Sequence, residues 1–505
     1  MKLHVFFLMV VGFVSQHLSA QVVFLKNPIN TSMSDDFNPS VSGDGKTLLY
    51  EMVYWNTNKA DVMISYQVNN SWSVPVIVPG VNTQSEALTN GGYFINHAGD
   101  IILFHSNRFR GIGGTDIYYS EKNAAGGWSA PVNFGKPINS TGNELDPSLS
   151  PDGKYMYYTV LSDKKTPSGK PCGKIMVTER ISSTSWKEPV ELPSTINTGC
   201  ECGGKILSDN KTFLFSSMRA GGKGGYDFYK SIRSENGSFS TPVNFAFVNT
   251  ANDDKYISIA AGGSMLYSDA PGKGKDERDI IIAKVPEDMQ PEMVKLYQGK
   301  VLNATTKKPV ASQITVTHVN SGFTTVYRTT ADGSYSVPVL ASGDYDVSIF
   351  PAAPGFEYKS FYNPTTTTIK YELKDINYEL KPLAKGSKIE LTTITFNDSL
   401  ELDKKSELEL NRVKLLLKVN PLLNIQLLAY TDKVDIDTIR HHSRDKEILN
   451  LEDSTMTYSN DYTQDQAKIL NDYLVKAGIP ASRMSYKGMG VNVAEARKKY
   501  EVVVK

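Results

Sequence analysis

Between about Val22 and Pro286 the chain repeats one order of apolar and polar positions five times. In each unit a polar turn leads into a short apolar strand, followed by a Gly-rich loop, an aromatic alternating strand and a brief final strand. The turn aspartates Asp44, Asp100, Asp152 and Asp209 stand 52 to 57 residues apart. A regular period of this length is typical of units that bury their faces against one another. Four short strands per unit predict the blades of an all-β propeller.

The two ends of this repeat complement each other. The fifth unit ends at Ile280–Lys284 without its final strand, whereas Val23–Asn30 aligns with Val132–Asn139, the final strand of the second unit. We therefore expect the N-terminal segment to complete the last blade, which removes the open edges of the ring. The prediction is a propeller of five blades at 21–287, with six blades as the alternative.

Two further segments follow the repeat. From 295 to 383, short strands separated by Gly and Asp turns predict a small antiparallel β-sandwich. From 388 to 505, strands alternate with two amphipathic helices, at Lys404–Val419 and Gln464–Ala477, which predicts an α+β domain. The polar segment 433–461 is expected to be a surface insertion in this domain.

Residues 1–20 have the pattern of a secretory signal peptide. Lys2 precedes an apolar run, and Leu18-Ser19-Ala20 offers a cleavage site with small residues. No later stretch has the roughly 20 apolar residues of a transmembrane helix, so we expect an exported protein without a transmembrane segment. The chain has 54 basic and 54 acidic residues, which gives no electrostatic reason to expect a nucleic-acid partner.

Three cysteines, Cys172, Cys200 and Cys202, occur in the repeat region. An odd number in an exported protein allows one disulfide and a free thiol, and the sequence leaves the pairing open. Cys172 falls within the third unit and the other two fall in the loop that leaves it, so a disulfide between these loops is reasonable. No metal site or cofactor is predicted.

Each segment resembles a known family. The repeat, clearest at Asp146–Tyr158, resembles the WD40-like, TolB-type propeller repeats of exported bacterial proteins. Gly299–Ile349 resembles the carboxypeptidase regulatory-like domain, and Ile394–Phe396, Tyr430–Asp432 and Tyr473–Ile479 resemble motifs of the OmpA-like domain. The order of the three is similar to that of exported Bacteroidetes proteins such as the PorE component of the type IX secretion system. The helical repeats and lipid anchor of PorE-like proteins are not expected in this chain.

The OmpA-like resemblance implies a peptidoglycan site. Such domains hold the ammonium group of diaminopimelate with a carboxylate and its carboxylate with an Arg. The resemblance assigns the first role to Thr431-Asp432 and places Gln466 where the Arg would stand. A neutral amide lacks the charge-assisted pair, a loss of about 1–3 kcal/mol. The domain is therefore expected to bind peptidoglycan weakly, unless Arg440 or Arg444 substitutes, or to serve in docking alone.

Charged residues recur in the loops of the propeller. The loops between blades carry an acid and two Gly-rich loops carry an Arg, at Asp36, Glu86, Glu144, Glu201, Asp254, Arg108 and Arg219. These loops are expected on one face of the propeller. Their charges either hold adjacent blades in register or form a rim that binds protein or glycan.

Catalysis is not expected from the sequence. Glycoside hydrolases with five-bladed propellers need carboxylates that converge on the central channel, whereas the aspartates of this repeat recur at equivalent turns, as structural residues do. The sequence favours a periplasmic, non-enzymatic scaffold that links a protein-binding propeller to the cell wall or outer-membrane machinery. Its expected partners are peptidoglycan and periplasmic or outer-membrane proteins. The alternatives are a propeller that recognises glycans or a transporter, with a vestigial OmpA-like domain, and a glycosidase.

Overall fold

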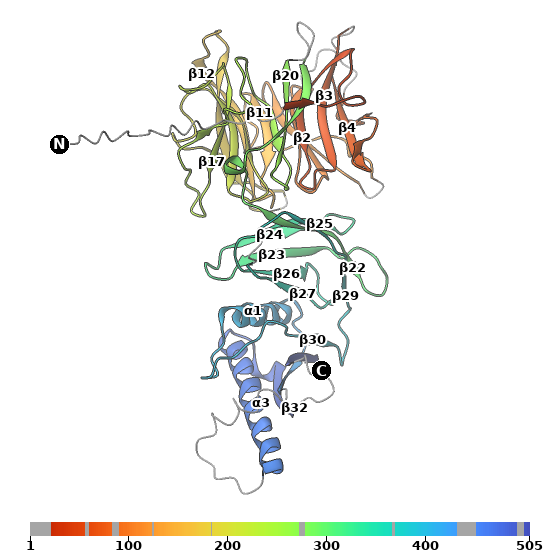
Figure 1. Cartoon of the computed structure of the whole chain (residues 1–505). Coiled ribbons are helices and arrows are strands. Elements are labelled where there is room, and N and C mark those ends of the chain that lie inside the picture. Colours follow the sequence, from red (N-terminus) through yellow and green to blue (C-terminus); the bar gives the residue numbers. More distant parts are fainter. Residues whose placement is uncertain are drawn as a thin grey trace, which may run out of the picture.

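The structure is a computed structural model that describes residues 22–55, 60–82, 90–123, 126–182, 184–271, 278–365, 369–431, 451–491 and 499–505. Three bodies are stacked one on another: a β-propeller, a β-sandwich in the middle and a domain of helices and strands (Figure 1). Strands dominate the chain. Within the described ranges, no helix has the length and apolar character needed to cross a membrane.

The propeller consists of five antiparallel sheets, each with its first strand towards the propeller axis. Blade 1 contains β2 (Ser34–Val41), β3 (Thr47–Tyr54), β4 (Ala60–Val68), β5 (Ser71–Trp72) and β6 (Val76–Ile77). Blade 2 contains β7 (Asn90–Ile95), β8 (Ile101–Ser106), β9 (Asp116–Glu121) and β10 (Val132–Asn133). Blade 3 contains β11 (Glu144–Leu149), β12 (Tyr155–Lys165), β13 (Pro171–Glu179) and β14 (Val190–Glu191). Blade 4 contains β15 (Glu201–Ile206), β16 (Thr212–Ser217), β17 (Asp227–Ile232) and β18 (Val243–Asn244), and blade 5 contains β19 (Ile257–Ile259), β20 (Met265–Pro271), β21 (Arg278–Lys284) and β1 (Val22–Phe24).

The N-terminal strand β1 completes the fifth blade, as the repeat predicts. It pairs antiparallel with β21, Val22 opposite Ala283, so that the two ends of the propeller close the ring. The side-chain amide of Asn30 fixes the junction, because it accepts from Ile280 N–H and donates to Ile280 C=O, both at 2.9 Å. An Asn makes the same pair of bonds to the third strand of every other blade, at Asn82, Asn139, Asn197 and Asn249. Each clasp gives the N–H of a third-strand residue its partner and adds a second donor to the C=O, which also accepts from a backbone N–H after the last strand, as Ile117 C=O does from Phe134 at 3.1 Å.

The sandwich packs two four-stranded sheets around one core. The first contains β25 (Ser334–Leu340), β22 (Val294–Asn303), β28 (Glu372–Asp375) and β29 (Tyr378–Leu380); the second contains β24 (Thr324–Arg328), β23 (Ser312–His318), β26 (Tyr345–Pro351) and β27 (Lys359–Asn363). A 3-10 turn, η1 (Glu287–Met289), joins it to the propeller. The expected antiparallel arrangement is wrong in the first sheet, where β28 and β29 run parallel to β22. These strands return from a distant part of the chain, so no local turn encodes their direction.

The C-terminal domain packs helices against a sheet of order β30–β33–β31–β32. Its elements are β30 (Lys388–Glu390), α1 (Lys404–Val419), β31 (Ile425–Thr431), α3 (Leu451–Lys476), η3 (Ala481–Arg483), β32 (Met484–Val491) and β33 (Tyr500–Val504). Helix α1 has the predicted bounds and begins after Asp403, whose carboxylate accepts from Ser406 N–H. Helix α3 begins earlier than predicted, inside the expected insertion, because residues 451–463 contain no Gly or Pro that would end a helix.

The sandwich and the C-terminal domain share one hydrophobic core. Phe350 and Tyr358 of the sandwich pack with Leu410 of α1. Beside them, the Arg412 guanidinium of α1 donates to the buried carboxylate of Asp346 on β26. The two domains therefore meet through buried apolar and charged contacts rather than through a linker alone.

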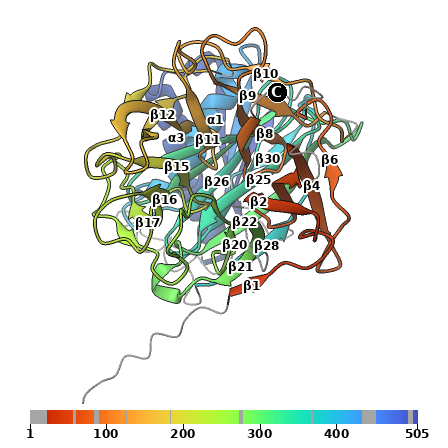
Figure 2. The same ribbon diagram turned by 90° about the horizontal axis from the view of Figure 1, so that it is seen from above.

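The propeller rests on the sandwich through the face that carries its Asp turns. The carboxylate of Asp209 accepts from the backbone N–H of Glu292 at 3.0 Å, and the amine of Lys211 lies 2.8 Å from the Glu292 carboxylate. The opposite face, which we call the open face, carries the Gly-rich loops and the loops between blades, and it points away from the other two bodies (Figure 1). Figure 2 looks onto the open face.

Candidate functional site

The inner strands of the propeller bring unlike residues to one ring of equivalent positions (Figure 2). In four blades the inner strand is bulged, and the bulged residue has a positive φ: 51° at Asn38, 58° at Gly92, 48° at Asp146 and 64° at Gly203. Asn, Asp and Gly tolerate this left-handed backbone better than other residues. Of these four positions, Asp146 alone adds a carboxylate.

Asp146 of β11 lies beside His105 of β8. The imidazole Nδ1 accepts from the backbone N–H of Asp146 at 3.2 Å and lies 3.9 Å from carboxylate oxygen Oδ1. Burial lowers the pKa of His105, so the ring is neutral at pH 7 and can accept this bond. Gly92 permits the approach, since a Cβ there would lie 2.6 Å from His105 Nδ1. The Asp146 side chain keeps 18% of its surface exposed, so it remains open to the channel.

Glu51 of β3 is a second acid at the axis. It is the counterpart of His105 in the neighbouring blade, because each pairs with the residue before the bulge of the inner strand. Glu51 is 8% exposed, and burial raises its pKa to about 8, with a smaller increase from the charges of Asp269 and Asp146. A carboxyl group with this pKa keeps its proton at neutral pH, which is the property of a general acid.

A third carboxylate, Asp269 of β20, is paired with Arg278 of β21, whose Nε donates to it at 2.7 Å. Burial raises the pKa of Asp269, and the Arg278 guanidinium opposes that rise. Burial also raises the pKa of nearby Tyr256, so its phenol remains a hydrogen-bond donor. The three acids of the axis thus differ in environment: Glu51 is desolvated, Asp146 is partly exposed and Asp269 is ion-paired.

The channel continues towards the sandwich as a cavity lined in part by Phe94, Leu149 and Lys205. The Lys205 amine donates to Ile257 C=O at 3.0 Å, and burial lowers its pKa to about 8. Burial lowers the pKa of His97, at the same cavity, to about 4. Within the described residues, no group of three His, Cys, Asp or Glu is placed to hold a metal ion.

The acids predicted for the propeller face are turned into their own loops. Backbone N–H groups donate to them, from Thr31 to Asp36 at 2.9 Å, from Ser140 to Glu144 at 3.2 Å, from Gly199 to Glu201 at 2.9 Å and from Thr250 to Asp254 at 2.7 Å. All four side chains are buried, and Glu86 lies outside the described residues. Their geometry favours a structural role in the loops over a role in ligand binding.

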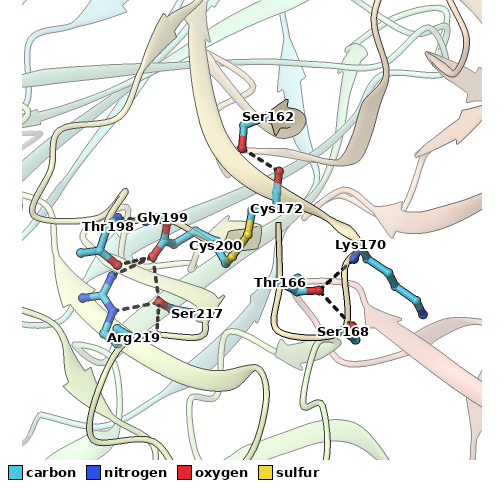
Figure 3. The surroundings of a disulfide bond; sticks show 11 residues. Ser162, Thr166, Ser168, Lys170, Cys172, Thr198, Gly199, Cys200, Ser217 and Arg219 are labelled. Atoms are coloured by element: carbon cyan, nitrogen blue, oxygen red, sulfur yellow. Dashed lines mark hydrogen bonds and ion pairs between the residues drawn. A yellow bond between two sulfur atoms is a disulfide. The ribbon is translucent and has the colours of Figure 1, made fainter. Parts of the chain in front are cut away.

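The two predicted arginines connect neighbouring blades. Arg219 lies 3.8 Å from the Glu201 carboxylate and donates to Ile196 C=O at 2.6 Å (Figure 3). Arg108 donates to Val81 C=O at 3.1 Å, and its guanidinium lies 4.8 Å from the centre of the Phe104 ring. Both therefore tie a blade to the loop that precedes it.

Of the three cysteines, Cys172 and Cys200 form a disulfide and Cys202 is a buried free thiol (Figure 3). The disulfide joins the start of β13 to the loop before β15, and so links blades 3 and 4. Burial raises the pKa of Cys202, which keeps the thiol protonated and unreactive.

Only part of the predicted peptidoglycan site lies among the described residues. Thr431 is buried at the end of β31, whereas Asp432 and the two candidate arginines, Arg440 and Arg444, lie outside the described residues. Gln466 is buried in α3, and its Oε1 has no hydrogen-bond partner within the part of the chain that the structure describes. The structure thus places one acceptor at the position where the OmpA-like resemblance predicts an Arg.

Glu51, His105 and Asp146 were not identified from the sequence, although a signal exists. The residue after the aromatic residue of the second strand is polar in four blades but differs each time: Glu51, His105, Thr159 and Ser216. A repeat that keeps its backbone pattern and changes one polar position marks a place where the blades are not chemically equivalent.

No protein-family model matches the chain, and no curated protein matches it. Among solved structures, the propeller is similar to the catalytic domain of a GH62 α-L-arabinofuranosidase from Coprinopsis cinerea, at 12% identity over 52% of this chain and 94% of that chain, with a TM-score of 0.34. It is also similar to a putative glycoside hydrolase from Parabacteroides distasonis, at 10% identity over 53% of this chain and 97% of that chain, with a TM-score of 0.35. The C-terminal region is similar to the OmpA-like domain of FopA1 from Francisella tularensis, at 11% identity over 32% of this chain and 76% of that chain, with a TM-score of 0.17. Identities this low describe the fold alone.

The predictions of a non-enzymatic scaffold and of no catalytic activity are contradicted, because the propellers that this chain resembles are glycoside hydrolases. The expectation rested on the turn aspartates alone, and these do not lie at the axis. The turn aspartates such as Asp209 belong to the face that meets the sandwich. The groups at the axis, Glu51, His105 and Asp146, are of different types in different blades, so the symmetry of the backbone does not exclude catalysis.

Proposed function

We propose that the propeller cleaves glycosidic bonds at its axis. The observation that carries this proposal is the combination of Glu51, which holds its proton at neutral pH, with Asp146, a partly exposed carboxylate whose charge raises the Glu51 pKa. Glycoside hydrolysis uses two carboxyl groups, one that protonates the leaving oxygen and one that activates water or attacks the sugar. The two side chains come from blades 1 and 3, and thus approach the channel from different directions.

In this mechanism Glu51 is the general acid. Desolvation favours the protonated form of Glu51. Transfer of this proton to the glycosidic oxygen becomes favourable when the substrate supplies a hydrogen-bond acceptor in the buried site. Asp146 is the base or nucleophile. His105 is a positioning residue, because its neutral Nδ1 accepts from the Asp146 backbone N–H and fixes the bulge from which the carboxylate projects.

Two further groups would act on the substrate hydroxyls. The Asp269 carboxylate, held by Arg278, is an acceptor at the channel wall, and the Tyr256 phenol is a donor. Sugars present many hydroxyl groups that both donate and accept, so a wall with both kinds of partner suits them.

The test is release of reducing sugar by the full chain from a panel of arabinan, xylan, polygalacturonate and purified peptidoglycan. Glu51→Gln and Asp146→Asn should each lower the rate by about 10²–10⁴-fold, whereas Asp472→Asn, an exposed acid on α3, should leave it unchanged. Tryptophan fluorescence would verify that each variant folds. No release from any glycan by the wild-type chain, or full activity of Glu51→Gln, would overturn the proposal.

We further propose that the chain acts in the periplasm, after export directed by residues 1–20, and that its OmpA-like domain holds it on peptidoglycan. Gln466 supports this, because its Oε1 has no partner among the described residues and its amide N–H groups, at the position where the resemblance expects the Arg, can donate to the ligand carboxylate. The expected ligand set is Thr431, Asp432 and Gln466. In sedimentation with purified peptidoglycan, Gln466→Leu should reduce retention of the full chain, whereas the matched Gln313→Leu on the sandwich should not. Equal retention of both variants would refute the assignment.

A further inference from the structure

Among the described residues of the open face, the exposed charges are mostly basic, with Asp163 and Asp253 as exposed acids. The acids that the sequence places there are buried in their loops and bonded to backbone N–H groups, as described for Asp36, Glu144, Glu201 and Asp254. They are therefore not available to neutralise basic side chains at the surface. Composition alone hides this asymmetry, because the chain as a whole is neutral.

The longest hairpin of the propeller, β12–β13 of blade 3, carries three of these basic residues. Lys164, Lys165 and Lys170 are exposed, and none forms an ion pair with a described residue. Asp163, which precedes them, is the one exposed acid of the hairpin. We call the three lysines the basic lip. The lip extends from blade 3, because β12 pairs with β11, the strand that carries Asp146.

The basic lip is held in place by several contacts (Figure 3). The Cys172–Cys200 disulfide ties the hairpin, two residues after Lys170, to the loop before β15. At its tip, Thr166 N–H donates to Lys170 C=O at 2.7 Å and Lys170 N–H donates to Thr166 Oγ1 at 3.1 Å. A hairpin fixed in this way presents its charges with little further loss of conformational entropy on binding.

A second basic group on the same face stands next to an exposed aromatic ring. Phe109, in the Gly-rich loop of blade 2, is 88% exposed, and the Arg110 guanidinium lies 5.8 Å from its ring centre. Arg110 is exposed as well. A ring beside a cation suits a ligand with an apolar face and a negative group.

We propose that the glycan bound at the propeller axis is a polyanion whose sugar rings carry carboxylate groups, and that the basic lip of blade 3 and Arg110 of the neighbouring blade 2 hold these groups at the open face. The proposal rests on the glycosidic function proposed above and names its substrate class. Lysine and arginine form charge-assisted hydrogen bonds with carboxylates, and a field of one sign at a channel mouth concentrates ligands of the other sign. The Phe109 ring would stack on a sugar face beside the carboxylate that Arg110 binds.

The test measures binding rather than turnover, in the Glu51→Gln background, so that it is independent of cleavage. Polygalacturonate should bind at least about tenfold more tightly than its methyl ester, which has the same backbone without the charges. The preference should weaken as salt rises. Lys164→Gln/Lys165→Gln/Lys170→Gln should abolish the preference.

The matched control removes three exposed lysines of the other domains, Lys385, Lys418 and Lys476, and should bind like the parent. Equal binding of the ester and the acid, or equal loss in the control, would overturn the proposal. Binding of polyglutamate as tight as that of polygalacturonate would overturn its assignment to a glycan. If polygalacturonate binds tightly but the wild type cleaves no glycan, the glycosidic function alone is refuted. If the wild type cleaves neutral glycans and does not prefer polygalacturonate to its ester, the assignment of a polyanionic substrate alone is refuted.

Discussion

Replacement of Arg412 by Met should weaken the joint between the sandwich and the C-terminal domain. The Arg412 side chain is 6% exposed and faces two buried carboxylates, Asp346 of the sandwich and Glu409 of its own helix, at 2.8 Å from the latter. Met retains the apolar stem but removes every donor of the guanidinium. The variant therefore leaves two buried negative charges without their cation.

The expected loss of stability is about 3–5 kcal/mol at pH 7, because an ion left buried without its partner costs more than the pair contributes. Glu409 keeps a donor in Tyr358 at 2.7 Å and another in Thr393 at 2.9 Å. The described residues offer the Asp346 carboxylate no hydrogen bond other than that from Arg412, so Asp346 accounts for most of the loss. Burial raises the pKa of Asp346 and Arg412 opposes this, so the pKa rises further in the variant. The loss of stability should therefore shrink as the pH falls and the carboxyl group takes up a proton.

Two spectroscopic signals separate the ends of the molecule in a urea titration. All four tryptophans, Trp55, Trp72, Trp128 and Trp186, lie in the propeller, and the α-helices of the described residues, α1 and α3, lie in the C-terminal domain. Arg412→Met should move the helix transition seen by circular dichroism to lower urea and leave the tryptophan transition in place. Each transition is treated as its own two-state step.

An exposed ion pair provides the control. Lys468→Met removes the contact with Asp472 one turn along α3, at 3.0 Å, and should leave the helix transition close to that of the wild type, because both side chains are exposed to solvent. Arg412→Met/Asp346→Asn should recover part of the loss, since it removes the unpaired charge. A loss below about 1 kcal/mol for Arg412→Met, or an equal shift of the tryptophan transition, would refute the buried joint.

Three further predictions concern the propeller and use the same tryptophan transition. The pKa of Glu51 is about 8 in the folded chain against an ordinary 4.5, so ionisation of this group lowers the stability of the fold as the pH rises between these values. Glu51→Gln should therefore remove part of the decrease of stability with pH. An unchanged pH dependence would contradict the desolvation of Glu51. Reduction of the Cys172–Cys200 disulfide, which joins residues 28 positions apart, should cost about 2–4 kcal/mol and leave the helix transition unmoved. Asn139→Ala should cost about 1–3 kcal/mol, because it leaves the buried Ile117 N–H without its partner, whereas Ile117 C=O keeps a donor in the backbone N–H of Phe134 at 3.1 Å. Wild-type stability of this variant would show that the clasp is dispensable.

The blades and the closure of the ring could be predicted because their information is local. A turn, a strand and the next turn lie within one unit, and the likeness of Val23–Asn30 to Val132–Asn139 identifies the missing strand. The Asn clasps are contained in the same likeness, since both segments end in Asn. The hydrogen bonds of these Asn side chains could not be predicted, because a bond from a side chain to a strand of the same blade produces no periodic pattern of apolar residues.

Features that join distant parts of the chain could not be predicted. The parallel pairing of β22 with β28 sets Lys295 opposite Glu372, and no turn records its direction. The Arg412–Asp346 pair likewise joins two domains that the sequence shows as separate segments. Such contacts depend on how finished elements pack against one another, and a single sequence offers no periodicity from which to infer them.

The symmetry of the repeat was expected to argue against catalysis, but in this propeller it is compatible with a catalytic site. Positions that keep one residue in every blade, such as the clasp at Asn30 and Asn139, hold the ring together. Positions with one backbone geometry and unlike residues, such as Glu51 and His105, place different chemical groups at one radius and one depth around the axis. A ring built from equal blades can therefore assemble an acid, a neutral imidazole and a second carboxylate without any departure from its fold. In such a chain the site is found where the repeat stays regular in structure and changes in chemistry.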